Sequence, residues 1–115
     1  DKPFANARKM IDEGCAVALG SDYNPGSCFS NSIPLIISLA CIKMRMTPEE
    51  ILTSLTINGA AALDRETSIG SIEIGKKADM LILKYPDYRY LMYNTGINIV
   101  NVVVKNGEIK LINKY

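Results

Sequence analysis

The chain contains no histidine, and its 115 residues include only three cysteines. The absence of histidine removes the commonest metal ligand and the commonest general base. The cysteines, Cys15, Cys28 and Cys41, are widely spaced and form no Cys-x-x-Cys motif. An odd number of isolated cysteines predicts free thiols in a reducing compartment, and we expect the cytoplasm. Their spacing matches no common zinc-ligand pattern, which disfavours a zinc site made from these three.

Charge bias and long apolar runs are also missing. The net charge of +1 gives no electrostatic reason to expect binding to nucleic acid or to an anionic membrane. The apolar run 33–42 is too short to span a bilayer, and it is interrupted by Pro34 and Ser38. The hydrophobic fraction of 48% predicts a globular core, and the length of 115 residues suits one domain or a piece of something larger.

The beginning of the chain is also informative. It opens with Asp1-Lys2-Pro3, without the basic residues and apolar run of a signal peptide, so we expect none. It does not begin with Met, and the first residues lead into a predicted helix. We therefore expect a fragment of a longer protein.

The stretch 15–27 carries the candidate site. Residues 15–19 form an apolar run with the length and composition of a strand buried on both faces. The run stops at Gly20, Asp22 follows, and the turn residues of 24–27 come next. Barrels of alternating strands and helices place reacting groups at the carboxyl ends of their strands. The alternative is that Asp22 only caps a turn, and the spacing alone leaves both interpretations open.

Apolar periodicity predicts two helices in the first part of the chain. One covers 3–13 and ends at Gly14. The other can be capped by Asn31 or Ser32 and runs from residue 33 to about Arg45. It is apolar on nearly every side, so we expect it to be largely buried.

Two further helix starts follow. Thr47 is a cap, the next residue is a proline, and Glu50 completes a capping box. A second start at Thr56 or Asn58 precedes a short helix over 59–63. The small residues there either permit close approach to a neighbour or reflect ordinary helix propensity.

From residue 68 onward the pattern predicts strands. Residues 80–83 indicate a strand, 86–88 a turn, and 97–104 a mostly buried strand. Asn106-Gly107 is a strong hairpin signal that joins this strand to 109–112. The sequence therefore predicts a small antiparallel β unit, packed against the preceding helical part.

Three passages resemble the metal-dependent amidohydrolase superfamily: the acid at the end of 18–22, the two helix starts within 46–63, and the glycine-containing passage 69–80. The resemblance implies an α/β fold, namely the C-terminal part of a (β/α)8 barrel followed by part of a small antiparallel β-sandwich. Residues 1–67 would form the last helix, strand and helices of the partial barrel. Residues 68–115 would form the C-terminal β subdomain segment.

Within this superfamily the chain most closely resembles the imidazolonepropionase family. The similarity lies in 20–27, in Tyr88-x-Tyr90, in Tyr93-x-x-Gly96-x-Asn98 and in 103–107. That family hydrolyses the ring amide of 4-imidazolone-5-propanoate to N-formimino-L-glutamate during histidine degradation. It holds one divalent metal, zinc or iron, with a His-x-His pair, a later histidine and an aspartate. The resemblance implies a cytoplasmic homodimer that acts on a small molecule and binds neither nucleic acid nor membranes.

The resemblance assigns roles to residues of the loop. Asp22 would be the metal ligand and the catalytic carboxylate that accepts a proton while water attacks the carbonyl carbon. Asn24, Gly26 and Ser27 would contact the substrate, since short polar side chains and a glycine N–H suit a ligand with a carboxylate and an amide. For Asn24 and Gly26 a plain turn is the alternative.

This sequence departs from the family pattern because it has no histidine. Three of the four implied metal ligands are missing, so we expect the chain alone neither to retain the metal nor to hydrolyse the substrate. A fragment would also leave apolar surface and sheet edges uncovered, so we expect self-association.

Two alternatives remain. Another amidohydrolase, dihydroorotase-like or deaminase-like, would share the position of Asp22 and the Gly-Lys-Lys-Ala-Asp passage of 75–79. A non-catalytic structural or interaction domain, in which Asp22 merely caps a turn, would explain the missing histidines.

Overall fold

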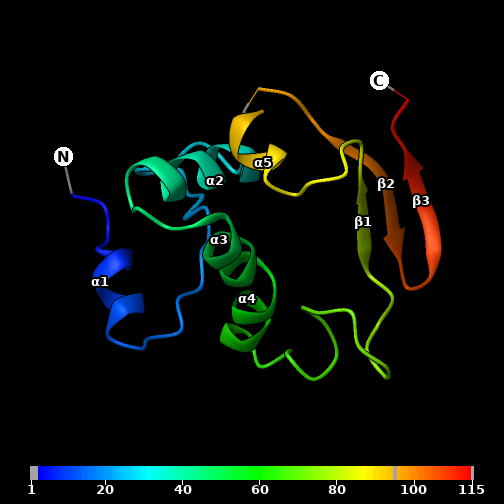
Figure 1. The fold of residues 1–115 in the computed structure, drawn as a ribbon, viewed down its shortest axis with the longest axis horizontal. Coiled ribbons are helices and arrows are strands. Elements are labelled where there is room, and N and C mark those ends of the chain that lie inside the picture. The colour runs from blue at the N-terminus through cyan, green and yellow to red at the C-terminus, as the bar shows by residue number, and fades with distance from the viewer. Residues whose placement is uncertain (1–2, 95, 115) are drawn as a thin grey trace.

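The structure, a computed structural model, describes residues 3–94 and 96–114. Helices make up the first part of this range and strands the last (Figure 1). The elements in order are α1 (Ala7–Asp12), α2 (Ile33–Ile42), α3 (Pro48–Leu55), α4 (Ile57–Ala62), β1 (Met80–Leu83), α5 (Tyr90–Tyr93), β2 (Val100–Lys105) and β3 (Glu108–Ile112). The result is a small α/β unit, and the predictions of a barrel, a sandwich and a division after residue 67 remain predictions.

The strands form the predicted antiparallel sheet in the order β1-β2-β3. Met80 pairs with Val104 across the first ladder, and Lys105 pairs with Glu108 beside the hairpin. Asn106 and Gly107 adopt φ of 51° and 76°. Positive φ at both central residues is what a two-residue type I′ hairpin requires, and the hairpin prediction is confirmed. β2 begins three residues later than predicted, and α5 was not predicted.

Capping chemistry sets the start of α2 and α3. The Ser32 hydroxyl accepts a hydrogen bond from the Leu35 amide. The helix α2 begins at Ile33, directly after Ser32. Thr47 and Glu50 form the predicted capping box, in which the Thr47 amide donates to Glu50 Oε2 at 2.9 Å. The Glu50 amide donates back to Thr47 Oγ1 at 3.2 Å. Two amides that the helix itself leaves unpaired are thereby satisfied.

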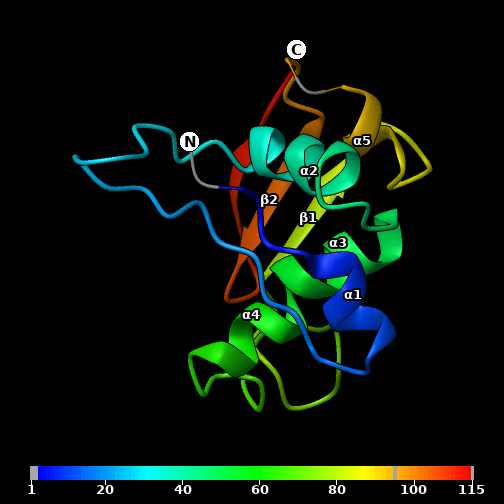
Figure 2. The ribbon, with the colours of Figure 1, turned by 90° about the vertical axis from the view of Figure 1, so that its left-hand side faces the viewer.

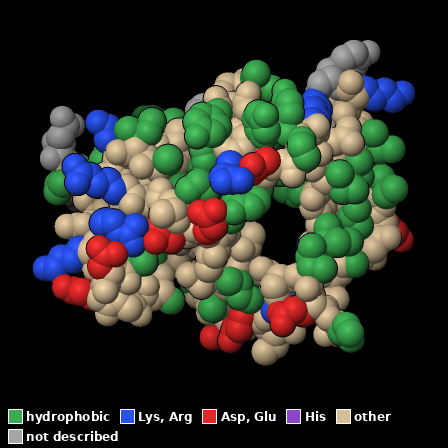
Figure 3. All heavy atoms as spheres, viewed as in Figure 1, with side chains coloured by type: hydrophobic (Ala, Val, Ile, Leu, Met, Phe, Trp, Pro, Cys, Tyr) green, Lys and Arg blue, Asp and Glu red, His purple; other side chains and the backbone are tan. Residues whose placement is uncertain are grey.

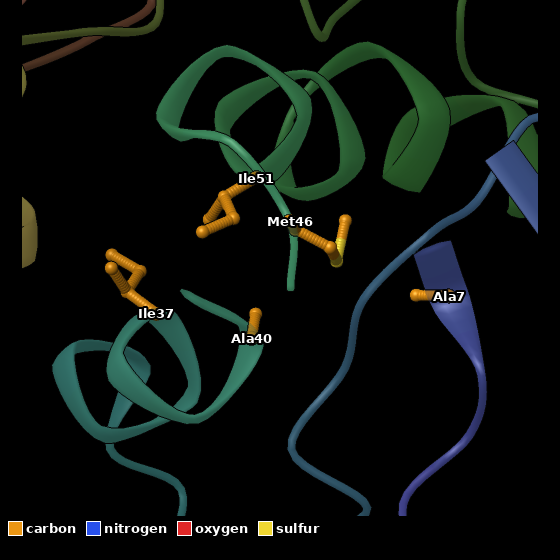
Figure 4. Packing of buried hydrophobic residues seen from close by; sticks show 5 residues of the cluster. All are labelled: Ala7, Ile37, Ala40, Met46 and Ile51. Carbon is orange, nitrogen blue, oxygen red and sulfur yellow. The ribbon is translucent and has the colours of Figure 1, made fainter. Parts of the chain in front are cut away.

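The buried core lies where α1, α2 and α3 meet. Figure 4 shows its side chains converging from these helices and from Met46, which precedes α3. Its members are at most 3% exposed: Ala7, Ile37, Ala40, Met46 and Ile51. This cluster is small for a chain of 115 residues. Many large apolar side chains consequently remain at the surface.

Two predictions about burial are wrong. Residues 15–20 run extended but pair with no strand, and Cys15, Ala16 and Ala18 are exposed. A strand buried on both faces needs neighbouring strands, and the described residues supply none beside this segment. The helix α2 stops at Ile42 instead of near Arg45, and it is buried on one side only. Ile42 is 72% exposed, and the elements with the main contacts to this helix in the described residues are α3 and α5.

The small residues of α4 do permit a close approach. Gly70 has φ of 95°, and a Cβ placed on it would lie 2.8 Å from Ala60 Cβ and 3.0 Å from Ile57 Cα. Only glycine fits against a helix at this distance and in this backbone conformation. The passage 69–80 therefore packs against α4 at Gly70, and this contact needs a small residue both there and at Ala60.

Apolar side chains gather over the sheet in the space-filling view, where the molecule is also hollowed between the helices and the sheet (Figure 3). Every residue of β3 is exposed, including Ile109 and Leu111. No helix in the described part of the chain is long and apolar enough to cross a membrane.

Candidate functional site

The loop 20–27, which carries Asp22, projects away from the body of the molecule (Figure 2). Asp22 has φ of 52° and is exposed, and within the described residues its carboxylate makes no ion pair or hydrogen bond. Aspartate tolerates this left-handed conformation better than most residues. The carboxylate is therefore exposed and without a partner in the described part of the chain, and its catalytic and turn interpretations both stay predictions.

Asp22 borders a hollow of about 500 Å³ between this loop and α2. The loop contributes Ala18 to Asp22, Ser27 and Cys28, and α2 contributes Ile36 and Leu39. The lining residues from α2 are apolar, and the polar lining residues, Ser21, Asp22 and Ser27, all come from the loop side. The hollow thus combines a few polar groups with apolar walls, as small-molecule sites do.

Asn24 holds the turn together. Its Oδ1 accepts from the amides of Gly26 at 2.9 Å and Ser27 at 2.8 Å, and its Nδ2 donates to the Asp22 carbonyl at 2.6 Å. Asn24 also pairs with Cys28 through its backbone. The Gly26 amide is consequently engaged within the loop. Of the residues predicted to contact substrate, Ser27 lines the hollow and Asn24 and Gly26 do not; all three roles remain predictions.

Two residues, one in α3 and one in α4, bind the segment that leads to Asp22. The helices α3 and α4 are together called the helix pair. The Leu19 amide donates to the Ser54 carbonyl at 3.2 Å, and Asn58 Nδ2 donates to the Val17 carbonyl at 2.9 Å. The sequence indicated Asn58 only as a possible helix start and gave no signal for Ser54. The spacing of 41 residues between Asn58 and Val17 left no local signal for this contact.

The donor set beside Asp22 does not fit a metal site by itself. No group of three or more cysteine, aspartate, glutamate or histidine side chains capable of holding an ion occurs among the described residues. The single S–H of the nearby Cys28 lies within hydrogen-bond distance of two carbonyls, those of Ser21 and Ser30. One carboxylate is fewer than the three protein ligands that catalytic zinc sites normally have.

The acidic residues of passage 69–80 have structural partners. Lys105 Nζ and the Asn106 amide each donate to the Asp79 carboxylate at 2.9 Å, and these contacts lower the pKa of Asp79. Asp79 thereby ties this passage to the hairpin turn. Hydrogen bonds from Ser71 and Lys76 likewise lower the pKa of Glu73.

Comparison with known proteins defines the class. The amidohydrolase family model matches residues 1–110, and the chain belongs to the amidohydrolase family. Its fold is similar to the crystal structure of an amidohydrolase from Thermotoga maritima MSB8, with a TM-score of 0.71 and 25% identity over 93% of this chain and 26% of that chain.

More particularly, the chain is similar to imidazolonepropionases. It is 63% identical over 109 residues to that of Parabacteroides distasonis, covering 95% of this chain and 26% of the relative. It is 60% identical over 108 residues to that of Clostridium tetani, covering 94% of this chain and 26% of the relative. The resemblance noted from sequence is confirmed, and the chain spans about a quarter of the length of these curated relatives.

Proposed function

We propose that this chain is part of an imidazolonepropionase, which hydrolyses the ring amide of 4-imidazolone-5-propanoate to N-formimino-L-glutamate in histidine degradation. The observation that carries the proposal is 63% identity to a protein of that name over 95% of the chain. The loop 20–27, which resembles that family most closely, favours it over a dihydroorotase-like or deaminase-like amidohydrolase.

Asp22 is the residue on which the catalytic part of the proposal rests. It combines an unpaired, exposed carboxylate with a place beside the hollow. Its proposed role is that of one oxygen ligand and proton acceptor in a site whose histidines lie on polypeptide outside these residues. The family resemblance implies zinc or iron, and such an ion supplies activation of water when bound.

The loop residues have different proposed contributions. Ser27 lines the hollow, and its hydroxyl, which is hydrogen-bonded to the Asn24 side chain in this structure, would exchange that partner for a substrate group. Asn24 and Gly26 hold the turn through the Oδ1 hydrogen bonds, and they act on the substrate through the position of Ser27 and Asp22. A homodimer in a reducing cytoplasm completes the proposal. The thiols of Cys15, Cys28 and Cys41 are free, as such a compartment favours.

The test is a chimera in which this chain replaces the matching quarter of the Parabacteroides distasonis enzyme. Asp22→Asn is compared with Asp64→Asn, a matched control because both aspartates are exposed and have φ of 52° and 55°. Asparagine is tolerated at positive φ, so neither change strains the backbone. We expect Asp22→Asn to lower kcat by at least about 100-fold and to reduce bound metal, with both unchanged in Asp64→Asn.

Each alternative has its own outcome. Hydrolysis of a different cyclic amide, with no turnover of 4-imidazolone-5-propanoate, would favour another amidohydrolase. Equal activity and metal content in both variants would favour the non-catalytic interpretation of Asp22.

A further inference from the structure

We propose that Asn58 is a positioning residue that fixes the segment carrying Asp22, an inference that rests on the role proposed for Asp22 above. The side chain of Asn58, in the first turn of α4, donates to the Val17 carbonyl at 2.9 Å. Val17 lies five positions before Asp22, in the run 15–20 that leads to it. The inference concerns where that segment is held, and Asn58 itself does not line the hollow beside Asp22.

The contact replaces a missing strand neighbour. In an extended chain, the N–H and C=O groups of residues two apart point to the same side. The Val17 carbonyl and the Leu19 amide both face the helix pair. The Val17 carbonyl accepts from Asn58, and the Leu19 amide donates to the Ser54 carbonyl. The helix pair thus offers one donor and one acceptor, in the places where a neighbouring strand would offer its own.

The two partners differ in how replaceable they are. Ser54 contributes a backbone carbonyl in the last turn of α3, where helices leave carbonyls unpaired, and any residue could supply it. Asn58 contributes the NH₂ donor of a side-chain amide. Only asparagine and glutamine have this uncharged group. The Val17 contact therefore depends on the identity of residue 58.

Side-chain packing supports the same placement. Val17 and Leu19 are partly buried against the core cluster, whereas the residues between and before them are exposed. Beyond Leu19 the chain leaves the helices and enters the projecting loop (Figure 2). The Asn58 and Ser54 contacts are consequently the last backbone anchors on the helix pair before Asp22.

The experiment compares Asn58→Ala with Asn101→Ala. Asn101 is a matched control, because it is also half-buried and its amide donates to one backbone carbonyl, that of Asn113, at 3.1 Å. It lies in β2, on the sheet. Both changes remove one hydrogen bond of the same kind, so we expect similar losses in Tm. A third variant, Asn58→Asp, keeps the size of the side chain but removes the donor.

Hydrogen exchange is measured on the full chain and on the chimera described above. Within 17–22 the Leu19 amide is the one that donates to an acceptor in the described residues, the Ser54 carbonyl. We expect Asn58→Ala and Asn58→Asp to speed the exchange of this amide by roughly tenfold, with no such change in Asn101→Ala. In the chimera we expect Asn58→Ala to lower kcat by roughly tenfold or more with KM little changed, because a displaced carboxylate impairs catalysis more than binding. Asn101→Ala should keep both constants.

Unchanged exchange of the Leu19 amide in Asn58→Ala would overturn the inference, as would equal losses of kcat in Asn58→Ala and Asn101→Ala. If the unsubstituted chimera has no activity, the proposed function fails on its own. The exchange data then still decide whether Asn58 fixes the segment.

Discussion

The guanidinium group of Arg8 binds the carboxylate of Glu50 through two parallel hydrogen bonds, Nη1 to Oε2 and Nη2 to Oε1, each 2.9 Å long. The pair joins α1 to the first turn of α3 across 42 residues of sequence. Glu50 also accepts from the Thr47 amide, so one carboxylate completes the helix cap and connects two helices. Planar, bidentate pairs of this kind have the best-defined geometry among ion pairs.

Neutralising Glu50 should remove an acid-sensitive contribution to stability. Its hydrogen bonds with Arg8 and with the Thr47 amide lower its pKa from the ordinary value of 4.5. A lowered folded-state pKa stabilises the fold above that ordinary value, and this contribution is lost as pH falls through the folded pKa. We expect Glu50→Gln to cost about 1 kcal/mol at neutral pH, with the difference shrinking on acidification.

Urea denaturation across this pH range measures the effect. Glu66→Gln is the control, because Glu66 is exposed and has no ion pair in the described part of the chain. A constant difference between Glu50→Gln and the unsubstituted chain at all pH values would contradict the prediction.

Gly70→Ala should destabilise the chain more than Gly75→Ala. The two glycines have φ of 95° and 91°, so the backbone strain of the change is the same. The new Cβ at Gly70 would press on Ala60, whereas nothing lies within 4 Å of the corresponding position at Gly75. We expect a loss of about 1–2 kcal/mol for Gly75→Ala from strain alone, and about 1–3 kcal/mol more for Gly70→Ala. Equal losses by chemical denaturation would show that the contact with α4 relaxes freely.

The chain alone should bind no divalent metal tightly and should not hydrolyse 4-imidazolone-5-propanoate. A single carboxylate does not replace the three protein ligands of a catalytic zinc site, and the sequence contains no histidine. Metal content after dialysis against zinc or iron, together with an assay for N-formimino-L-glutamate, measures both expectations. Stoichiometric metal or turnover by the purified chain would refute them.

The chain alone should also self-associate through its sheet. In the sheet formed by the described residues, β1 and β3 are the edge strands, and Ile109 and Leu111 of β3 are 64% and 53% exposed. Open edges with apolar side chains favour pairing between copies. We expect light scattering to show a mass that rises with concentration, and Ile109→Lys with Leu111→Lys to suppress the rise. As a control, Leu63→Lys changes an exposed apolar residue outside the sheet. A monomer at all concentrations would count against this expectation.

Short-range patterns determined much of the fold. Thr47 and Glu50 lie three residues apart, and Asn106 and Gly107 are adjacent, so the cap and the hairpin turn are specified within a few residues. The position of Asp22 after an apolar run was equally visible in the sequence, as was the resemblance to amidohydrolases. The cap and the hairpin turn depend on local backbone preferences, which neighbouring residues fix.

Tertiary structure alone decided how the Asp22 segment is held. The run 15–19 has the composition of a buried strand, yet it lies extended against α3 and α4, because burial depends on which elements are present beside it. The partners of Val17 and Arg8 lie 41 and 42 residues away, and no local preference selects them. The sequence by itself determined where α2 and α3 begin, where the hairpin turns and which carboxylate follows the apolar run. Only packing decided that Asn58 and Ser54 would anchor that run, since distant groups become neighbours only when the helices assemble.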